Sequence, residues 1–342
     1  MSASKTISLA LDMYGGDHGP RVTVAAACDA LRARPDLEIT LVGPAEDQRN
    51  LISGLNKAQK SRLKFIATQT VLESGVGPLT AIRQGSKSSM GRCLALVAES
   101  RADACVSAGS TTALMALGVR KLGMLNGLKR PALMSRIPSA SGFTSLLDLG
   151  ANLKVDALQL VQFAIMGIVA HRRDGQDRPS VGLLNVGHED SKGHAVVRDA
   201  HERLKALPIN YAGFIEGNDI FSGAVDVAVC DGFSGNLIIK SSEGLATMLL
   251  GALGKGLELN WRSSLGAKLL KPALSGVLAR FDPAQHNGAP LLGLKGVVVK
   301  SHGSAERAAM LQAILEASDE ARKQVPERIQ TLIEEYRAET ES

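Results

Sequence analysis

Short apolar runs alternate with stretches of helical periodicity along most of this chain, and this alternation constrains its fold more than any other feature. Apolar runs predict strands at residues 7–11, 39–42, 64–67, 104–107, 132–135, 145–149, 181–185 and 225–230. Helical patterns predict helices at 20–33, 78–100, 111–121, 155–170, 192–206 and 236–253, and within 305–337, where Pro326 splits the pattern. Such alternation favours right-handed crossovers and a mainly parallel sheet with helices on both faces. We therefore expect an α/β fold.

Length and composition bound the size and chemistry of the core. The 342 residues can form a single α/β catalytic domain over residues 1–342, or two lobes. Because 45% of the residues are hydrophobic and 3% are aromatic, the core must be largely aliphatic, which suits parallel sheets. The four cysteines lie far apart without a C-x-x-C pair, so we expect buried free thiols and a reducing compartment: Cys28, Cys93, Cys105 and Cys230.

Charge and hydropathy limit the classes of binding partner and the cellular location that are expected. A net charge of +5 attracts acidic partners without choosing between a carrier protein, an anionic membrane and phosphate. The basic residues are scattered, and one Trp and three Tyr offer little stacking surface, so no nucleic-acid partner is expected. The chain opens without a signal-peptide pattern, and no apolar run reaches the ~20 residues needed to span a bilayer. A cytoplasmic protein is expected.

The first polar loop follows the first predicted strand and opens a predicted helix at Pro20. It contains two carboxylates, two glycines and a histidine: Asp12, Gly15, Gly16, Asp17 and His18. Backbone N–H groups at a helix start bind anions. The loop matches neither the G-x-G-x-x-G nor the G-x-x-x-x-G-K-[ST] nucleotide fingerprint. A plain turn with a helix cap explains this loop as well as an anion site does.

The next two loops have the same design. Residues 106–112 place Ser107, Gly109 and Ser110 between a strand and a helix, where hydroxyls either cap the helix or donate to phosphate oxygens. Asp148 lies at the end of the strand predicted at 145–149, and Asn152 follows it. In open α/β sheets ligands bind at the carboxyl ends of strands, so we expect these polar groups to face a ligand.

The fourth loop, residues 183–193, carries Asn185 and Lys192. We expect a helix to begin near Lys192, where the helix dipole favours negative charge and a lysine is therefore misplaced. An anionic ligand would remove that conflict, which makes Lys192 a candidate site residue. A solvated surface lysine is the alternative.

Two more loops complete the set. Residues 230–236 form a turn with two glycines before a helix, and residues 299–304 repeat the design; their candidate site residues are Asp231, Ser234, Gly235, Asn236 and His302. Six loops of one type, each after an apolar strand, predict one anion-lined cleft. Asp12 and Asp17 are expected to organise that cleft, because carboxylates repel a phosphate dianion.

The motifs that the sequence lacks also narrow the chemistry. It contains no H-E-x-x-H motif, no cysteine cluster and no G-x-S-x-G elbow, so neither a metal site nor a hydrolase nucleophile is expected. A phosphate-dependent acyl transfer needs no protein nucleophile, because inorganic phosphate is itself one. The protein must then hold phosphate, orient the acyl carbonyl and stabilise the oxyanion.

Taken in order, these segments resemble the phosphate acyltransferase family of bacterial phospholipid synthesis, the acyl-acyl-carrier-protein:phosphate transacylases. The resemblance covers about residues 7–317 and rests on a series of loops in the right order, at 12–18, 88–90, 107–109, 130–132, 147–152, 162–164, 183–187, 192–193, 231–236, 288–293 and 302–303. The D-G-F-S-G-N segment at 231–236 differs from the family pattern by one Thr→Ser change. Ser110-Thr111-Thr112 replaces the family's N-T-G, so no asparagine role carries over to Ser110.

The resemblance implies an activity and a set of partners. The family moves a long-chain acyl group from acyl carrier protein to inorganic phosphate, and the acyl phosphate feeds a membrane glycerol-3-phosphate acyltransferase. The fold is similar to that of the isocitrate and isopropylmalate dehydrogenases, and the protein works as a homodimer without cofactor, metal or nucleotide. By the match of motifs, Lys192 and Asn236 are the expected catalytic residues: Lys192 holds phosphate or the thioester oxygen, and Asn236 orients the carbonyl.

Residues 255–282 predict an amphipathic helical protrusion, within a protruding region near 250–282. The stretch combines basic residues with leucines and Trp261, a pattern typical of interfacial helices that contact anionic membranes. The resemblance implies peripheral membrane contact here, on the inner face of the cell membrane. A helix pair at a dimer interface is the alternative.

Two other functions fit the fold class. A phosphotransacetylase-like enzyme would use acyl-coenzyme A, but would not need the basic apolar stretch. A non-catalytic binding protein on the same fold is disfavoured because Lys192 and Asn236 are both retained.

Overall fold

The computed structural model describes residues 6–44, 55–73, 75–171, 178–258 and 283–341, and the single residue Gly276. Within these ranges eleven strands form one sheet in the order β3-β2-β1-β4-β11-β10-β5-β6-β9-β7-β8. The strands are β1 Ile7–Asp12, β2 Leu37–Gly43, β3 Leu63–Ala67, β4 Ala104–Ser107, β5 Ala132–Ser139, β6 Gly142–Leu147, β7 Val181–Leu184, β8 Tyr211–Ile215, β9 Val227–Val229, β10 Ala289–Leu292 and β11 Val297–Lys300.

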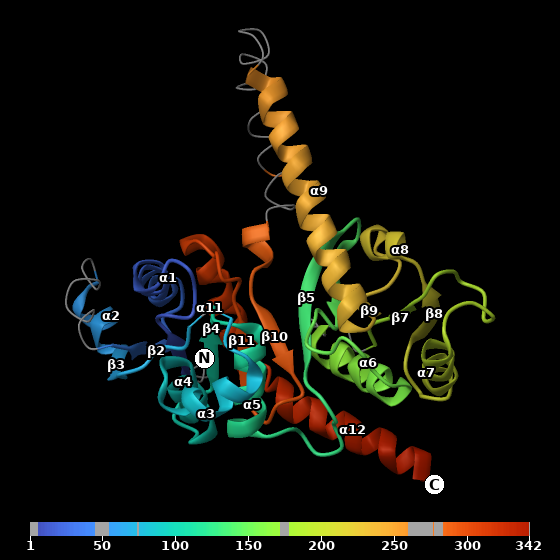
Figure 1. Cartoon of the computed structure of the whole chain (residues 1–342), viewed down its shortest axis with the longest axis horizontal. Helices are drawn as coiled ribbons and strands as arrows, with labels where there is room; N and C mark the ends of the chain where they lie inside the picture. Colours follow the sequence, from blue (N-terminus) through green and yellow to red (C-terminus); the bar gives the residue numbers. More distant parts are fainter. Residues whose placement is uncertain are drawn as a thin grey trace, which may run out of the picture.

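Helices connect most of the strands (Figure 1). They are α1 Pro20–Ala33, α2 Lys57–Ser61, α3 Pro78–Gln84, α4 Ser89–Ala98, α5 Thr111–Leu122, α6 Ala157–His171, α7 Ala195–Lys205, α8 Gly217–Ser222, α9 Gly232–Glu258, α11 Arg307–Arg322 and α12 Val325–Glu341, with short 3₁₀ turns at Gly85–Lys87 and Pro283–His286. The one helix expected over 78–100 is two helices, because the turn at Gly85–Lys87 interrupts it and Ser88 caps α4 by accepting from Gly91 N–H.

The sheet is mostly parallel, as expected, and it is divided into two parallel blocks. Strands β3, β2, β1, β4 and β11 pair in parallel, and so do β6, β9, β7 and β8. Between the blocks, β11–β10, β10–β5 and β5–β6 pair antiparallel. Three successive reversals leave the second block running in the opposite sense to the first.

Helices cover both faces of the first block. Leu9 and Leu11 of β1 belong to a buried cluster with Ala27 of α1 and Ile314 of α11. Ala10, which points to the other face of the strand, packs with Leu94 and Leu117 of α4 and α5. Full burial on both faces explains why the strands read as continuous apolar runs. All four cysteines are buried free thiols, as predicted.

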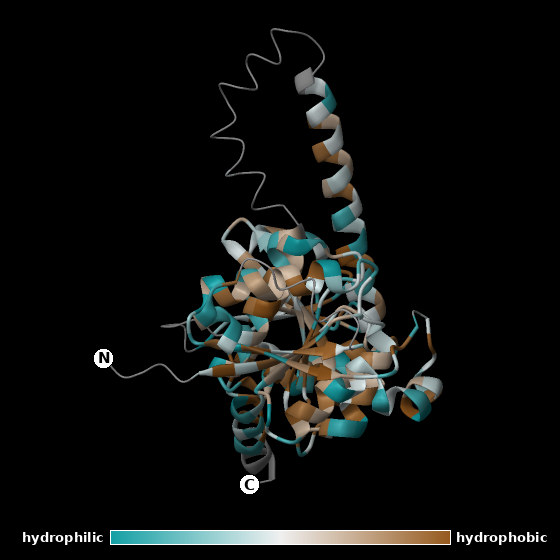
Figure 2. Ribbon diagram, turned by 90° about the vertical axis from the view of Figure 1, so that its left-hand side faces the viewer, coloured by the Kyte–Doolittle hydropathy of each residue, from teal (hydrophilic) through white to brown (hydrophobic). Residues whose placement is uncertain are grey.

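Helix α9 stands apart from the rest of the chain (Figure 1). By length and composition alone its residues 232–256 could cross a membrane, and none of that window is buried. Four apolar side chains, Leu245, Met248, Leu249 and Leu253, are each 41–61% exposed and share one face by their spacing. Figure 2 shows hydrophobic stretches along this exposed helix. Residues 259–275 and 277–282, where the amphipathic protrusion is predicted, lie outside the described residues.

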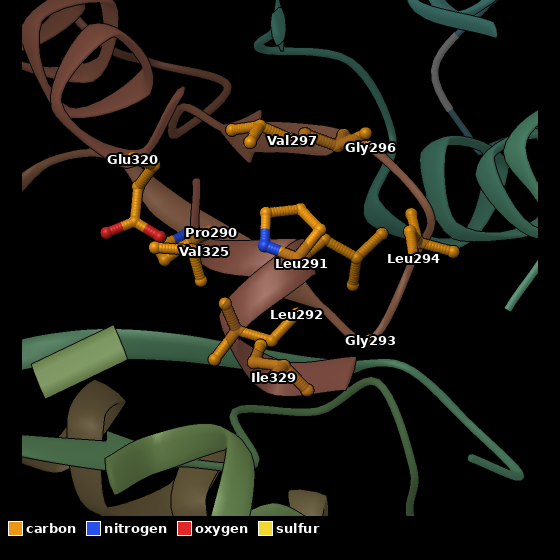
Figure 3. Close-up of a pocket in the computed structure, with 12 residues that line it drawn as sticks. Pro290, Leu291, Leu292, Gly293, Leu294, Gly296, Val297, Glu320, Val325 and Ile329 are labelled. Atoms are coloured by element: carbon orange, nitrogen blue, oxygen red, sulfur yellow. The ribbon is translucent and has the colours of Figure 1, made fainter. Parts of the chain in front are cut away.

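A small cavity lies beside β10 and β11 (Figure 3). It measures 10 Å³, which is room for about one water, and Glu320 of α11 lies on its wall with Leu291 and Ile329. Glu320 is 1% exposed, and its Oε1 atom has no hydrogen-bond partner among the described residues. Burial, reinforced by the charge of Glu316, raises the pKa of Glu320 to about 8. This carboxyl is therefore protonated at neutral pH.

Replacing Glu320 by glutamine is expected to remove a pH-dependent loss of stability. The folded pKa of about 8 lies above the ordinary value of 4.5, so the folded state keeps a proton that the unfolded chain releases. The wild type should lose stability as pH rises from about 5 to 8, and the variant should lose less. Melting curves should differ by a few degrees at pH 8 and coincide near pH 5. Parallel pH profiles would contradict the prediction, and Glu327→Gln on the exposed side of α12 is the control.

Candidate active site

Asp12 organises the first loop of the site. Its Oδ2 atom accepts a hydrogen bond from Ser107 Oγ at 2.7 Å, and Oδ1 accepts from Tyr14 N–H at 3.3 Å. The same Ser107 hydroxyl accepts from Gly109 N–H at 3.1 Å. Burial raises the pKa of Asp12, and hydrogen bonds from Ser89 and Ser107 oppose that rise. The carboxyl thus ties the end of β1 to the end of β4 and is buried.

Close approach of three loops explains the glycines. A Cβ at Gly15 would lie 2.6 Å from Gly109 N, and one at Gly16 would lie 2.8 Å from Gly303 O. Asp17 N–H donates to Gly303 O at 2.8 Å, so the loops after β1, β4 and β11 form one group. The Asp17 and His18 side chains are exposed at its rim. Ser110 caps α5, because its hydroxyl accepts from Ala113 N–H at 3.4 Å.

Two cationic side chains that were not among the predicted site residues lie beside the loop after β11: Lys300, the last residue of β11, and Lys240 of α9. Lys300 Nζ donates to Ala108 O at 3.2 Å and to Ser301 O. Burial lowers the pKa of Lys300 to about 8, while the Asp17 carboxylate acts in the opposite direction. Lys240 of α9 lies beside the same loop, with its Nζ 3.4 Å from His302 Nε2.

Asp148 and Asn152 form the base of the second group of loops. The buried Asp148 carboxylate accepts from the N–H groups of Leu133 (2.9 Å), Ala151 (3.2 Å) and Asn152 (2.6 Å), and from Asn152 Nδ2 (3.0 Å). Burial raises its pKa, and these hydrogen bonds limit the rise. Both side chains were expected to face a ligand. The structure instead assigns them to holding the end of β6 against the start of β5.

The first turn of α9 packs on this base. Asp231 caps the helix, since Ser234 N–H and Oγ donate to its carboxylate at 2.8 and 3.2 Å. Gly235 is required because a Cβ there would lie 2.0 Å from Asp148 O. Asn236 is exposed, and its Cβ atom lies 3.5 Å from the position that a Cβ on Gly150 would take. Asn236 is thus the most exposed of the predicted residues of this loop, while Asp231 and Ser234 are partly exposed.

Lys192 lies in the turn after β7. The prediction that a helix begins near Lys192 was wrong. Helix α7 begins at Ala195 with His194 as its N-cap, so Lys192 precedes the helix and is solvent-exposed. The turn is fixed by Gly193, whose φ is +85°, and by Asn185, whose Nδ2 donates to Gly187 O at 3.1 Å. Because β7 is next to β9, this turn and the start of α9 leave neighbouring parallel strands in the same direction.

The six loops, which were predicted to line one cleft, form two groups. The loops after β1, β4 and β11 are in contact, and those after β6, β9 and β7 follow adjacent strands of the opposite sense. Helix α9 connects the groups, since it starts on the Asp148 base and its Lys240 reaches His302. Asn236 and Lys240 are four residues apart and share one helix face, with Cβ atoms about 6 Å apart. The cavity of Figure 3 includes none of these residues.

Comparisons with known proteins identify the family. A family model described as "Fatty acid synthesis protein" matches residues 7–328. A phosphate acyltransferase of Shewanella amazonensis is 46% identical over 331 residues, which cover 96% of this chain and 97% of that relative. The chain belongs to the phosphate acyltransferase family. It is an acyltransferase, and acyl transfer to phosphate is the reaction of the family, so a non-catalytic binding protein is no longer an alternative.

Solved structures share the fold of this phosphate acyltransferase. A phosphotransacetylase from Streptococcus pyogenes aligns with a TM-score of 0.60 at 18% identity, covering 94% of each chain. A putative 4-hydroxythreonine-4-phosphate dehydrogenase from Salmonella typhimurium aligns with a TM-score of 0.53 at 11% identity, covering 94% of this chain and all of that one. At these identities the likeness concerns the fold alone. It agrees with the predicted α/β class, whereas the closer likeness to isocitrate and isopropylmalate dehydrogenases stays a prediction.

Proposed function

We propose that this phosphate acyltransferase moves a long-chain acyl group from the thioester of acyl carrier protein to inorganic phosphate, in the cytoplasm. The acyl phosphate would then serve a membrane glycerol-3-phosphate acyltransferase in phosphatidic acid synthesis. The observation that carries the proposal is the exposed residue Asn236, held in the first turns of α9 between the Asp148 base and the Lys240–His302 contact. The apolar helix α9 leads away from this residue and offers a surface to a long acyl chain and to a membrane.

The chemical step needs no group outside the two substrates and the chain. A phosphate oxygen attacks the thioester carbonyl carbon, the new C–O bond forms and the C–S bond breaks. The proton of the phosphate monohydrogen dianion passes to the departing thiolate, so charge and atoms balance. Asn236 donates its amide N–H to the carbonyl oxygen as negative charge develops there. Lys192 supplies a positive charge, to phosphate or to the thioester oxygen.

The donor is tested by thiol release and acyl-phosphate formation with purified protein. Palmitoyl-acyl-carrier-protein is expected to react with inorganic phosphate at a kcat/KM at least about 100-fold above that of acetyl-coenzyme A, because a buried acyl chain adds about 0.8 kcal/mol per methylene. A preference for acetyl-coenzyme A would replace this proposal by the short-chain phosphotransacetylase alternative. Omission of phosphate is the control for hydrolysis.

The exposed apolar face of α9 supports an assembly proposal. Leu245, Met248, Leu249 and Leu253 form a stripe long enough to pair two helices, so we assign it to the α9 of a second copy in a homodimer. The basic stretch 255–282 at the far end of α9 would then contact anionic lipid on the inner face of the cell membrane.

Flotation with vesicles tests the membrane contact. The full chain is expected to float with phosphatidylglycerol-containing vesicles and to sediment with pure phosphatidylcholine, because five basic residues oppose one acidic residue in 255–280. High salt should weaken the effect. Equal behaviour with both lipids would contradict the electrostatic contact. The homodimer is tested separately, by sedimentation velocity of the lipid-free protein, which should give twice the chain mass.

A further inference from the structure

Lys240 and His302 meet in an arrangement that lacks an acceptor. Lys240 Nζ lies 3.4 Å from His302 Nε2, across the gap between α9 and the loop after β11. On the other side of the ring, Ser304 N–H donates to His302 Nδ1 at 3.3 Å, and the Ser304 hydroxyl lies 2.8 Å from the same nitrogen. A backbone N–H can only donate, so Nδ1 accepts and the ring proton is on Nε2. Two donors therefore face each other.

The surrounding charges favour the neutral form of the His302 ring. Partial burial and the Lys240 charge lower the pKa of His302, which favours the neutral ring. Glu243, one turn further along α9, accepts from Lys240 Nζ at 2.7 Å and takes one of its three hydrogens. Lys300 and Asp17 complete the set of charged groups around the ring. Two ammonium hydrogens and the imidazole N–H remain available to a ligand.

The ligand these donors fit is a tetrahedral oxyanion. One oxygen placed between Lys240 Nζ and His302 Nε2 would accept from both and relieve the donor–donor contact. Lys300, held against Ala108 O at the end of β11, adds positive charge behind that position. Asn236 is one helical turn from Lys240 on the same face of α9, so an anion bound here lies next to the amide assigned to the acyl carbonyl.

We propose that Lys240 and His302, with Lys300 behind them, bind a phosphate group of the substrates. The inference rests on the proposed acyl transfer and adds a second cationic group to it, separate from Lys192. The phosphate group is the acceptor phosphate, because the site lies next to the amide assigned to the acyl carbonyl, whereas the phosphate of the donor's pantetheine arm is at the opposite end of that arm from the thioester.

Lys240→Met tests the site with steady-state kinetics and with calorimetric titration of inorganic phosphate into the donor-free protein. Loss of one charge-assisted hydrogen bond is expected to raise a KM about 10-fold or more. A rise in the KM for phosphate, with weaker phosphate binding, is the expected result; a rise confined to the KM for the donor would overturn the proposal. His302→Gln, which keeps a donor near the Nε2 position, should retain more affinity than His302→Ala.

The control is Lys64→Met. Lys64 is an exposed lysine paired with Glu38 at 2.6 Å, much as Lys240 is paired with Glu243, but it lies on the edge strand β3. If Lys240→Met folds normally by circular dichroism and leaves both KM values and phosphate binding at the Lys64→Met level, the inference is wrong. Calorimetry needs no acyl donor, so this failure is distinguishable from a failure of the proposed acyl transfer.

Discussion

Asn236→Ala is expected to lower kcat for acyl-phosphate formation by about 100-fold or more, with a smaller change in KM. A side-chain donor aimed at a developing oxyanion acts mainly in the transition state, and removal of one such donor typically costs 10²–10³ in kcat. The structure favours this assignment because Asn236 is exposed at the start of a helix that Gly235 and Asp231 hold in place. Single-turnover assays with an acyl-thioester donor measure the effect.

The matched control is Asn126→Ala, an exposed asparagine away from both loop groups. Lys192→Ala belongs in the same assay, because its ammonium is the other group assigned to the reaction. Near-normal transfer by either site variant, with an unchanged melting temperature, would refute the role of that residue. Loss in both variants but not in the control would place Lys192 and Asn236 in one site.

Gly235→Ala is expected to have the largest effect on stability. A Cβ at this position would lie 2.0 Å from the Asp148 carbonyl oxygen and 3.0 Å from Cys230 Sγ. Backbone cannot yield as a flexible side chain does, so the first turn of α9 must move off its base. We expect a loss of several kcal/mol, of the size seen for severe overpacking in a core, together with loss of transfer activity.

Gly244→Ala is the control on the same helix. No atom of the described residues lies within 4 Å of a Cβ at Gly244, and alanine is the better helix former by about 0.5–1 kcal/mol. The melting temperature should therefore stay equal or rise slightly for Gly244→Ala and fall by many degrees for Gly235→Ala. Equal behaviour of the two variants would show that the start of α9 is not fixed by its contact with Asp148.

Four strands of the first block, β1 to β4, were predictable because they are short apolar runs, whereas β11 was not among the predicted strands. The strand expected at 104–107 and the helix expected at 20–33 match β4 and α1. Strand β10 was missed because Pro290 stands in its second position, and proline argues against a strand that is flanked on both sides. Strand β8 was missed because Gly213 interrupts its pattern and it lies at the sheet edge.

The reversal between the two blocks was not predictable. Strands β10 and β11 come late in the chain yet lie in the middle of the sheet, beside β4 and β5. Local sequence patterns predict a strand but not which strands lie beside it. The six loops were therefore predicted to line one cleft, without their division into two groups. For the same reason Lys240 escaped notice: its partner His302 is 62 residues away in sequence, and only the direction of α9 brings them together.

Helix α9 also has a mechanical consequence. Its 27 residues span about 40 Å, and Lys240 lies about 12 Å from the end that is fixed on Asp148. A tilt of about 10° about that end would move the outer tip by about 7 Å and Lys240 by about 2 Å. That is enough to separate Lys240 from His302. A tilt of α9 would therefore change the distance between Lys240 and His302. A contact that held the outer end of the helix in the cell would also set the width of the gap in which phosphate is proposed to bind.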